Sequence, residues 1–120
     1  MRPKMPVRDW KFRIADILEA VQDSLEITRD MDYEAFRQDN RSMKAVLYNL
    51  AVIGEAARKV PEEVTVRYPA IPWREMGDMR NIVIHEYFGV DPKILWETIK
   101  NELPLIVTGL KSILADSQVM

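Results

Sequence analysis

The segment Met79–Asp91, MRNIVIHEYFGVD, combines residue types that could handle a phosphate group, and it holds the only histidine of the chain. Arg80 is permanently cationic and offers a planar fork of N–H donors that suits phosphate oxygens. His85 can accept or donate a proton near neutral pH. Asn81 precedes His85 by four residues, so its amide could orient the imidazole or bind a ligand oxygen. These residues, without a dense group of carboxylates, suit phosphoryl transfer that needs no metal ion.

RNA is a substrate for which this chemistry would be sufficient. Its own 2′-hydroxyl is the nucleophile, His85 could remove the proton, and Arg80 could stabilise the charge on the pentacoordinate phosphorus. A plainer interpretation stays open on spacing alone, because a lone histidine in an apolar helix is more often a hydrogen-bonded packing residue. Tyr87 by itself is equally consistent with a half-buried aromatic side chain. The spacing permits a site and does not establish one.

A helix would gather the polar residues of this segment on one side. Advancing about 100° per residue from Arg80 puts Asn81 at about 100° and His85 at about 140°, and returns Tyr87 to within about 20° of Arg80. The other side carries apolar residues that we expect in the core: Met79, Ile82 and Val83.

Composition restricts the class of protein. The chain has 120 residues, of which 48% are hydrophobic, and this is enough for one domain (residues 1–120) with a single core. The net charge of -2 argues against a strongly basic DNA-binding protein. Without cysteine there is no disulfide framework and no Cys-ligated zinc site. The basic start lacks an apolar stretch behind it, so we expect a cytoplasmic protein that does not interact with membranes.

Apolar residues at three- and four-residue steps predict an all-α fold, a four- to five-helix up-and-down bundle with its core in about residues 10–114. The long helices are expected at about 10–29, 41–59, 73–87 or 88, and 92–114, with short helical turns in 30–39 and after Pro61. The first helix has an apolar stripe that we expect to be buried: Phe12, Ile14, Ile17, Leu18, Val21, Leu25 and Ile27. The last helix has another: Ile94, Leu95, Ile99, Leu103, Ile106, Leu110 and Ile113.

Particular residues predict where these helices begin, end or bend. Asp9, Asp32 and the pair Asp91-Pro92 are expected to cap helix N-termini, and Gly89 is expected to end the third long helix. Pro104 should kink the last helix. Gly54 should allow a neighbouring backbone to approach closely.

Other catalytic constellations are weaker. Carboxylates and the histidine are present, but none stands at metal-ligand spacing: Glu55, Asp78, His85, Glu86 and Asp91. There is no Gly-rich phosphate loop and no serine beside the histidine. The clusters RDWKFR and RYPAIPWR mix arginine with aromatic residues as RNA-binding surfaces do, and solvated helix ends do the same more often.

The segment MRNIVIHEY resembles the R-x4-H-x-Y motif of HEPN-domain ribonuclease toxins of the HepT type. Three further segments are similar to the corresponding parts of that family: NLAVIGEAARKVPEEV, YPAIPWREMGDMRN and GVDPKILWETIKNELPLI. The resemblance extends over residues Ile14 to Leu114.

This resemblance implies a homodimeric all-α protein in which the motif helices of two subunits meet. It implies a metal-independent endoribonuclease, without cofactor or metal, that is the toxin of a type VII-like pair. Its partners would be RNA and an MntA-type nucleotidyltransferase antitoxin. By the same resemblance Arg80 and His85 are the catalytic pair, Asn81 supports them, and Tyr87 is the tyrosine that the antitoxin silences by AMPylation.

Two alternatives remain at this level. Related helical bundles serve as non-catalytic substrate-binding or adaptor subunits of nucleotidyltransferases, although these do not need a complete arginine–histidine motif. The second alternative is a structural dimer in which Arg80 and His85 only satisfy buried polar groups. Cleavage of RNA by the chain, and its loss on changing His85, separates both from an enzyme.

Overall fold

The computed structural model describes residues 9–87, 89 and 91–116, with the side chains of residues 10–84, 89 and 91–116. These residues form helices and no strand: α1 (Asp9–Thr28), α2 (Tyr33–Arg37), α3 (Asn40–Arg58), α4 (Glu62–Arg67), α5 (Trp73–Tyr87), α6 (Pro92–Glu97), the π-helical segment η1 (Thr98–Glu102) and α7 (Leu103–Ala115). The predicted all-α fold is confirmed for this part of the chain. None of its helices is long and apolar enough to cross a membrane, and a cytoplasmic location stays a prediction.

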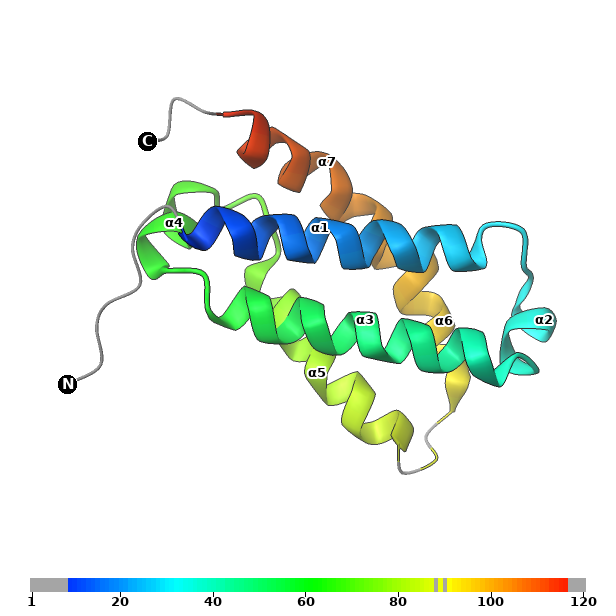
Figure 1. The fold of residues 1–120 in the computed structure, drawn as a ribbon. Helices are drawn as coiled ribbons and strands as arrows, with labels where there is room; N and C mark the ends of the chain where they lie inside the picture. The colour runs from blue at the N-terminus through cyan, green and yellow to red at the C-terminus, as the bar shows by residue number, and fades with distance from the viewer. Residues whose placement is uncertain (1–8, 88, 90, 117–120) are drawn as a thin grey trace.

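Four long helical segments make up the bundle, and successive segments run in opposite directions (Figure 1). They are α1, α3, α5 and the continuous stretch α6–η1–α7. Helix α3 lies at the centre of the arrangement, because it packs against both α1 and α5, while α7 packs against the other side of α1. The position of α5 therefore depends mainly on α3.

The core lies along the faces that these segments turn toward one another. On α1 the fully buried apolar residues recur at three- and four-residue steps, as expected for one helix face: Trp10, Ile14, Ile17 and Val21. The prediction was wrong for Phe12, which is 68% exposed. Phe12 follows the buried Trp10 by two residues and so points about 200° away from it around the helix. Trp10 fills that end of the core instead.

Aspartate side chains that cap the helix N-termini determine where several of the helices begin. The carboxylates of Asp32 and Asp91 accept hydrogen bonds from backbone N–H groups of their own helices, at 2.8 and 2.9 Å, and Pro92 follows as the first helical residue. Both predicted caps are confirmed. Asp39 caps α3 in the same way. Helix α1 begins at Asp9, whose predicted capping side chain lies outside the described residues.

The predicted kink at Pro104 takes the form of a π-helical segment directly before it. Proline has no N–H to donate to the carbonyl four residues earlier, and its ring would press against that carbonyl. The preceding turn therefore widens: the N–H of Leu103 donates to the carbonyl of Thr98, five residues back. The chain stays helical from α6 to α7, with the interruption confined to η1.

Candidate active site

The residues singled out from the sequence lie on α5, and local contacts define both ends of this helix. At its start the indole N–H of Trp73 donates to the carbonyl of Tyr68 at 2.9 Å, and the N–H of Met76 donates to the carbonyl of Pro72 at 3.0 Å. Beyond its end Gly89 has φ +90°, a conformation that other residues rarely adopt. The predicted stop at Gly89 is confirmed.

Helices α3 and α5 cross in close contact at Gly54. A Cβ atom on Gly54 would lie 3.0 Å from the backbone nitrogen of Arg80, 3.2 Å from its Cβ and 3.2 Å from the carbonyl oxygen of Gly77. Only glycine allows this approach without a shift of the backbones. Beside the crossing, Nε of Arg58 donates to the same Gly77 carbonyl at 3.2 Å. The predicted close approach at Gly54 is confirmed, and it occurs at the motif arginine.

The side chain of Arg80 is half exposed, at 52%, and one of its nitrogens faces a carboxylate. Its Nη1 lies 3.6 Å from Oε1 of Glu55 on α3. The guanidinium is therefore held beside α3 and still open to solvent, as a group that binds an anion must be. Glu55 was considered from the sequence only as a metal ligand. Its position directly after Gly54 was the signal that it would lie beside the neighbouring helix.

The other predicted site residues follow Arg80 along the same helix. Asn81 is exposed next to it. His85 and Tyr87 belong to α5 by their backbone, and their side chains lie outside the described residues. The helix offsets His85 from Arg80 by about 7.5 Å along its axis, and from Asn81 by about one turn. Their roles in catalysis and modification remain predictions.

The burial of α5 differs from the expectation that Met79, Ile82 and Val83 all lie in the core. Met76 and Met79 are fully buried, but Ile82 and Val83 are only partly buried. Ile84 is 46% exposed, as its position between Arg80 and Asn81 around the helix predicts. Figure 1 shows the reason for the partial burial: α5 diverges from α3 toward its C-terminal end, so that less of the bundle covers it there. A helical wheel treats all turns alike and cannot show that the motif lies in the less covered half.

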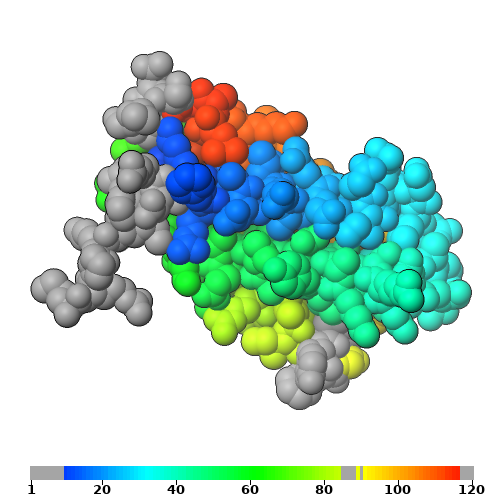
Figure 2. All heavy atoms as spheres, viewed as in Figure 1, coloured from blue at the N-terminus to red at the C-terminus, as the bar shows by residue number. Residues whose placement is uncertain are grey.

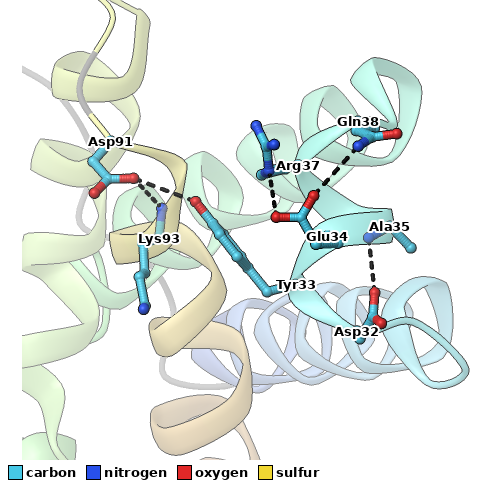
Figure 3. Close-up of polar contacts among 8 residues, drawn as sticks. All are labelled: Asp32, Tyr33, Glu34, Ala35, Arg37, Gln38, Asp91 and Lys93. Atoms are coloured by element: carbon cyan, nitrogen blue, oxygen red, sulfur yellow. Dashed lines mark hydrogen bonds and ion pairs between the residues drawn. The ribbon is translucent and has the colours of Figure 1, made fainter.

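The connection after α5 is anchored on α2, as Figure 3 shows. The hydroxyl of Tyr33 points from α2 to Asp91 and donates to its Oδ1 at 3.4 Å, and the same oxygen accepts the backbone N–H of Lys93. The ammonium group of Lys93 lies 5.7 Å from the centre of the Tyr33 ring. Desolvation by burial, followed by the charge of Asp91, raises the pKa of Tyr33. Sequence spacing gave no indication of this contact between residues 58 positions apart.

Two grooves in the described surface lie away from α5. One, of about 490 Å³, runs between α1 and α3, which lie side by side in Figure 2, and includes three carboxylates: Asp16, Glu19 and Asp23. This acidic lining repels phosphate groups and does not suit RNA. The other lies between α1 and the α6–α7 stretch, with Lys100 and Pro104 in its wall. Arg80 contributes to neither groove.

Comparison with known proteins agrees with the motif. The family described as ribonuclease HepT-like matches residues 17–113. A "Putative RNase" of Methanocaldococcus jannaschii is 44% identical over 93% of this chain and 97% of its own length. A "Probable ribonuclease HepT" of Thermococcus cleftensis is 42% identical over 81% of this chain and 88% of its own. A "Putative RNase" of Caldanaerobacter subterraneus is 37% identical over 82% of this chain and 88% of its own.

No solved structure matches the chain. The family match covers most of the described bundle, from α1 to α7, and it includes the whole of α5 with its Arg80–His85–Tyr87 motif. The resemblance stated from the sequence is thereby confirmed, and with it the class of enzyme. The chain belongs to the HepT-like ribonuclease family.

Proposed function

We propose that this chain is the toxin of a toxin–antitoxin pair and that it cuts RNA internally without a metal ion. Its family supports the ribonuclease activity. The observation that carries the assignment to α5 is Arg80, whose side chain is half exposed at 52% and whose backbone lies at the crossing of two helices. The same helix carries His85, the one histidine of the sequence, and histidine is the residue type suited to taking and giving a proton near neutral pH.

The proposed reaction is an internal transesterification followed by departure of the 5′-oxygen. His85 takes the proton of a ribose 2′-hydroxyl, and the oxygen attacks the adjacent phosphorus. Arg80 stabilises the negative charge that develops on the phosphoryl oxygens. The bond from phosphorus to the 5′-oxygen then breaks, and that oxygen takes up a proton. The products are a 2′,3′-cyclic phosphate and a 5′-hydroxyl, so all atoms are accounted for.

The reaction needs a base and an acid, and we propose that a homodimer supplies both. Two copies related by a two-fold axis would bring two histidines and two arginines into one composite site. The exposure of Ile84, 46% in the single chain, supports this arrangement. It leaves an apolar side chain next to His85 on the part of α5 that the bundle covers least, where a second copy could cover it.

The direct test is cleavage of RNA in the presence of a chelator. His85→Ala should reduce the rate at least about 100-fold, because a positioned general base contributes that much or more. Arg80→Ala should reduce it about 100- to 1,000-fold by removing a donor to the developing charge. Arg29→Ala, which removes a surface arginine that pairs with Glu26, is the matched control and should cleave normally. The product ends, identified by mass, should be a cyclic phosphate and a 5′-hydroxyl.

Three results would contradict this proposal in different ways. Full activity of His85→Ala would refute the mechanism. Loss of activity in EDTA would indicate a metal-dependent nuclease. A wild-type chain that cleaves no RNA, and whose expression alone leaves cell growth unchanged, would favour the non-catalytic adaptor of a nucleotidyltransferase instead.

We further propose that a nucleotidyltransferase antitoxin of the MntA type silences the toxin by AMPylating Tyr87. The phenolic oxygen would attack the α-phosphorus of ATP, releasing pyrophosphate and the phenolic proton. The attached AMP would bring negative charge and bulk two residues from His85, where an RNA phosphate must bind. Incubation with the cognate antitoxin and ATP should raise the intact mass by whole AMP units. A mass increase that persists in Tyr87→Phe would exclude this tyrosine as the acceptor.

A further inference from the structure

The carboxylate of Glu55 on α3 faces two cations at the crossing with α5. Its Oε1 lies 3.6 Å from Nη1 of Arg80, and its Oε2 lies 3.6 Å from Nζ of Lys59. All three side chains are about half exposed. Ion pairs on a surface contribute little to folding stability, so these two pairs do little to hold the bundle together.

On both sides of Glu55, residues of α3 contact the backbone of α5 and so fix Glu55 relative to Arg80. Gly54, the preceding residue, lies so close to α5 that an added Cβ would be 3.0 Å from the Arg80 nitrogen. Arg58, three residues after Glu55, donates to the Gly77 carbonyl at 3.2 Å, one turn before Arg80. The carboxylate thus meets the guanidinium because two rigid helices are locked together, which distinguishes this pair from those formed within one exposed helix turn.

We propose that Glu55 is a positioning residue for Arg80 in RNA cleavage, an inference that rests on the proposed function. The carboxylate holds the guanidinium at Nη1 and leaves its other N–H donors available to phosphate oxygens. A guanidinium already held in place loses less conformational freedom when it meets the transition state. Glu55 therefore acts through Arg80 and does not itself contact the reacting atoms.

This role predicts that the loss of Glu55 lowers turnover without weakening the binding of RNA. A carboxylate beside the site repels a polyanion, so Glu55 cannot serve to bind RNA, and Lys59 offsets only part of its charge. Removing the carboxylate should lower kcat while KM stays the same or falls. A residue needed only for folding would instead lower the thermal midpoint and the amount of active enzyme, with no such divergence.

The test measures kcat and KM for a single-stranded RNA oligonucleotide chosen from sites that the wild-type chain cuts in total cellular RNA. Glu55→Ala should lower kcat about tenfold, since small misplacements of a catalytic group have effects of this order or larger. Glu55→Gln keeps an oxygen that can accept from the guanidinium and should lose less. In the Arg80→Ala background, Glu55→Ala should lower kcat no further, because Glu55 acts on the reaction only through the guanidinium of Arg80.

Two further measurements separate positioning from other roles. Glu26→Gln removes a glutamate of another surface ion pair, with Arg29 at 2.8 Å, and should leave kcat and KM unchanged. Affinity for the same oligonucleotide with a 2′-deoxy residue at the cut site should be unchanged or tighter in Glu55→Ala, whereas Arg80→Ala should bind more weakly. Thermal unfolding should give the same midpoint for Glu55→Ala and the wild-type chain.

The failure of this inference differs from failure of the proposed function. Wild-type kcat and KM in Glu55→Ala, together with the expected loss of activity in Arg80→Ala, would overturn the positioning role alone. A further fall in the double variant below Arg80→Ala would show that Glu55 acts independently of the arginine and would also overturn it. Full activity of Arg80→Ala, or no cleavage of RNA by the wild-type chain, would overturn the proposed function and the inference together.

Discussion

The two halves of α5 differ in their surroundings and in the residues they carry. The first half, Trp73–Met79, is packed into the bundle, with Met76 and Met79 buried and Gly77 against Arg58. From Arg80 onward the described side chains are half-buried or exposed. The boundary lies at the crossing with α3, where Gly54 meets the backbone of Arg80. The buried half fixes the helix, and the other half leaves Arg80, Asn81 and Ile84 exposed.

The two halves of α5 should differ most in how much the free energy of unfolding falls when an apolar side chain is truncated. Met79→Ala in the buried half should lower the free energy of unfolding by about 2–5 kcal/mol, because it leaves a cavity in the core. Ile84→Ala is its counterpart in the exposed half and should cost less than about 1 kcal/mol. Urea denaturation of both variants at a protein concentration that keeps the chain monomeric measures this. Equal losses would contradict the division of α5 into two environments.

The crossing itself should be the next most sensitive feature. Gly54→Ala should lower the free energy of unfolding by about 1–3 kcal/mol, because its Cβ would press on backbone atoms that cannot move aside. It should also reduce RNA cleavage by shifting Arg80. Gly109→Ala is the matched control, since a Cβ there meets only side-chain atoms of Ile71, at 3.1 and 3.4 Å. A Gly54→Ala variant as stable and active as Gly109→Ala would show that the close approach is unimportant.

A polar change in the exposed half should affect association more than folding. Ile84→Ser should alter the unfolding free energy of the single chain by no more than about 0.5–1 kcal/mol. If a second copy covers this residue, the same variant should dissociate at higher protein concentration than the wild-type chain. Sedimentation equilibrium measures the dimer constant directly. Unchanged dimerisation would place Ile84 outside the proposed interface.

The smallest expected effect concerns the start of α3, the helix that supports the buried half of α5. The N–H and hydroxyl of Ser42 lower the pKa of Asp39 from its ordinary value of 3.8. A lowered pKa in the folded state means that this contribution to stability is present above pH 3.8 and is lost as the pH falls through the folded pKa. Asp39→Ala should therefore destabilise the chain at neutral pH and matter less in strong acid. A difference between variant and wild type that is independent of pH would exclude this cause.

Local chemistry made much of the fold predictable. Asp32 and Asp91 cap helices because an aspartate side chain reaches N–H groups two or three residues ahead, wherever the helix lies in the protein. Gly89 ends α5 because its positive φ suits glycine. Helix periodicity found most of the core in the same way. Phe12 and Ile94 were expected inside and are 68% and 46% exposed, because each lies off the buried face of its helix, Phe12 two residues from Trp10 and Ile94 one residue from Leu95.

Part of the candidate site could be predicted from the sequence, and part depends on the tertiary structure. That Arg80, Asn81, His85 and Tyr87 share one helix follows from the sequence, and so does the family, because both depend on residue types and spacing. That Glu55 faces Arg80 depends on two helices far apart in sequence meeting at Gly54. That Ile82 and Val83 are only partly buried likewise depends on where α5 leaves α3.

The sequence by itself determined the helices, their ends, the motif and the ribonuclease family, since each is set by interactions within a few residues or by residue identity along the chain. Only the tertiary structure decided which half of α5 is covered and which carboxylate accompanies the motif arginine. Those outcomes arise from how helices pack and cross, and packing is set by contacts between distant residues that no local pattern contains.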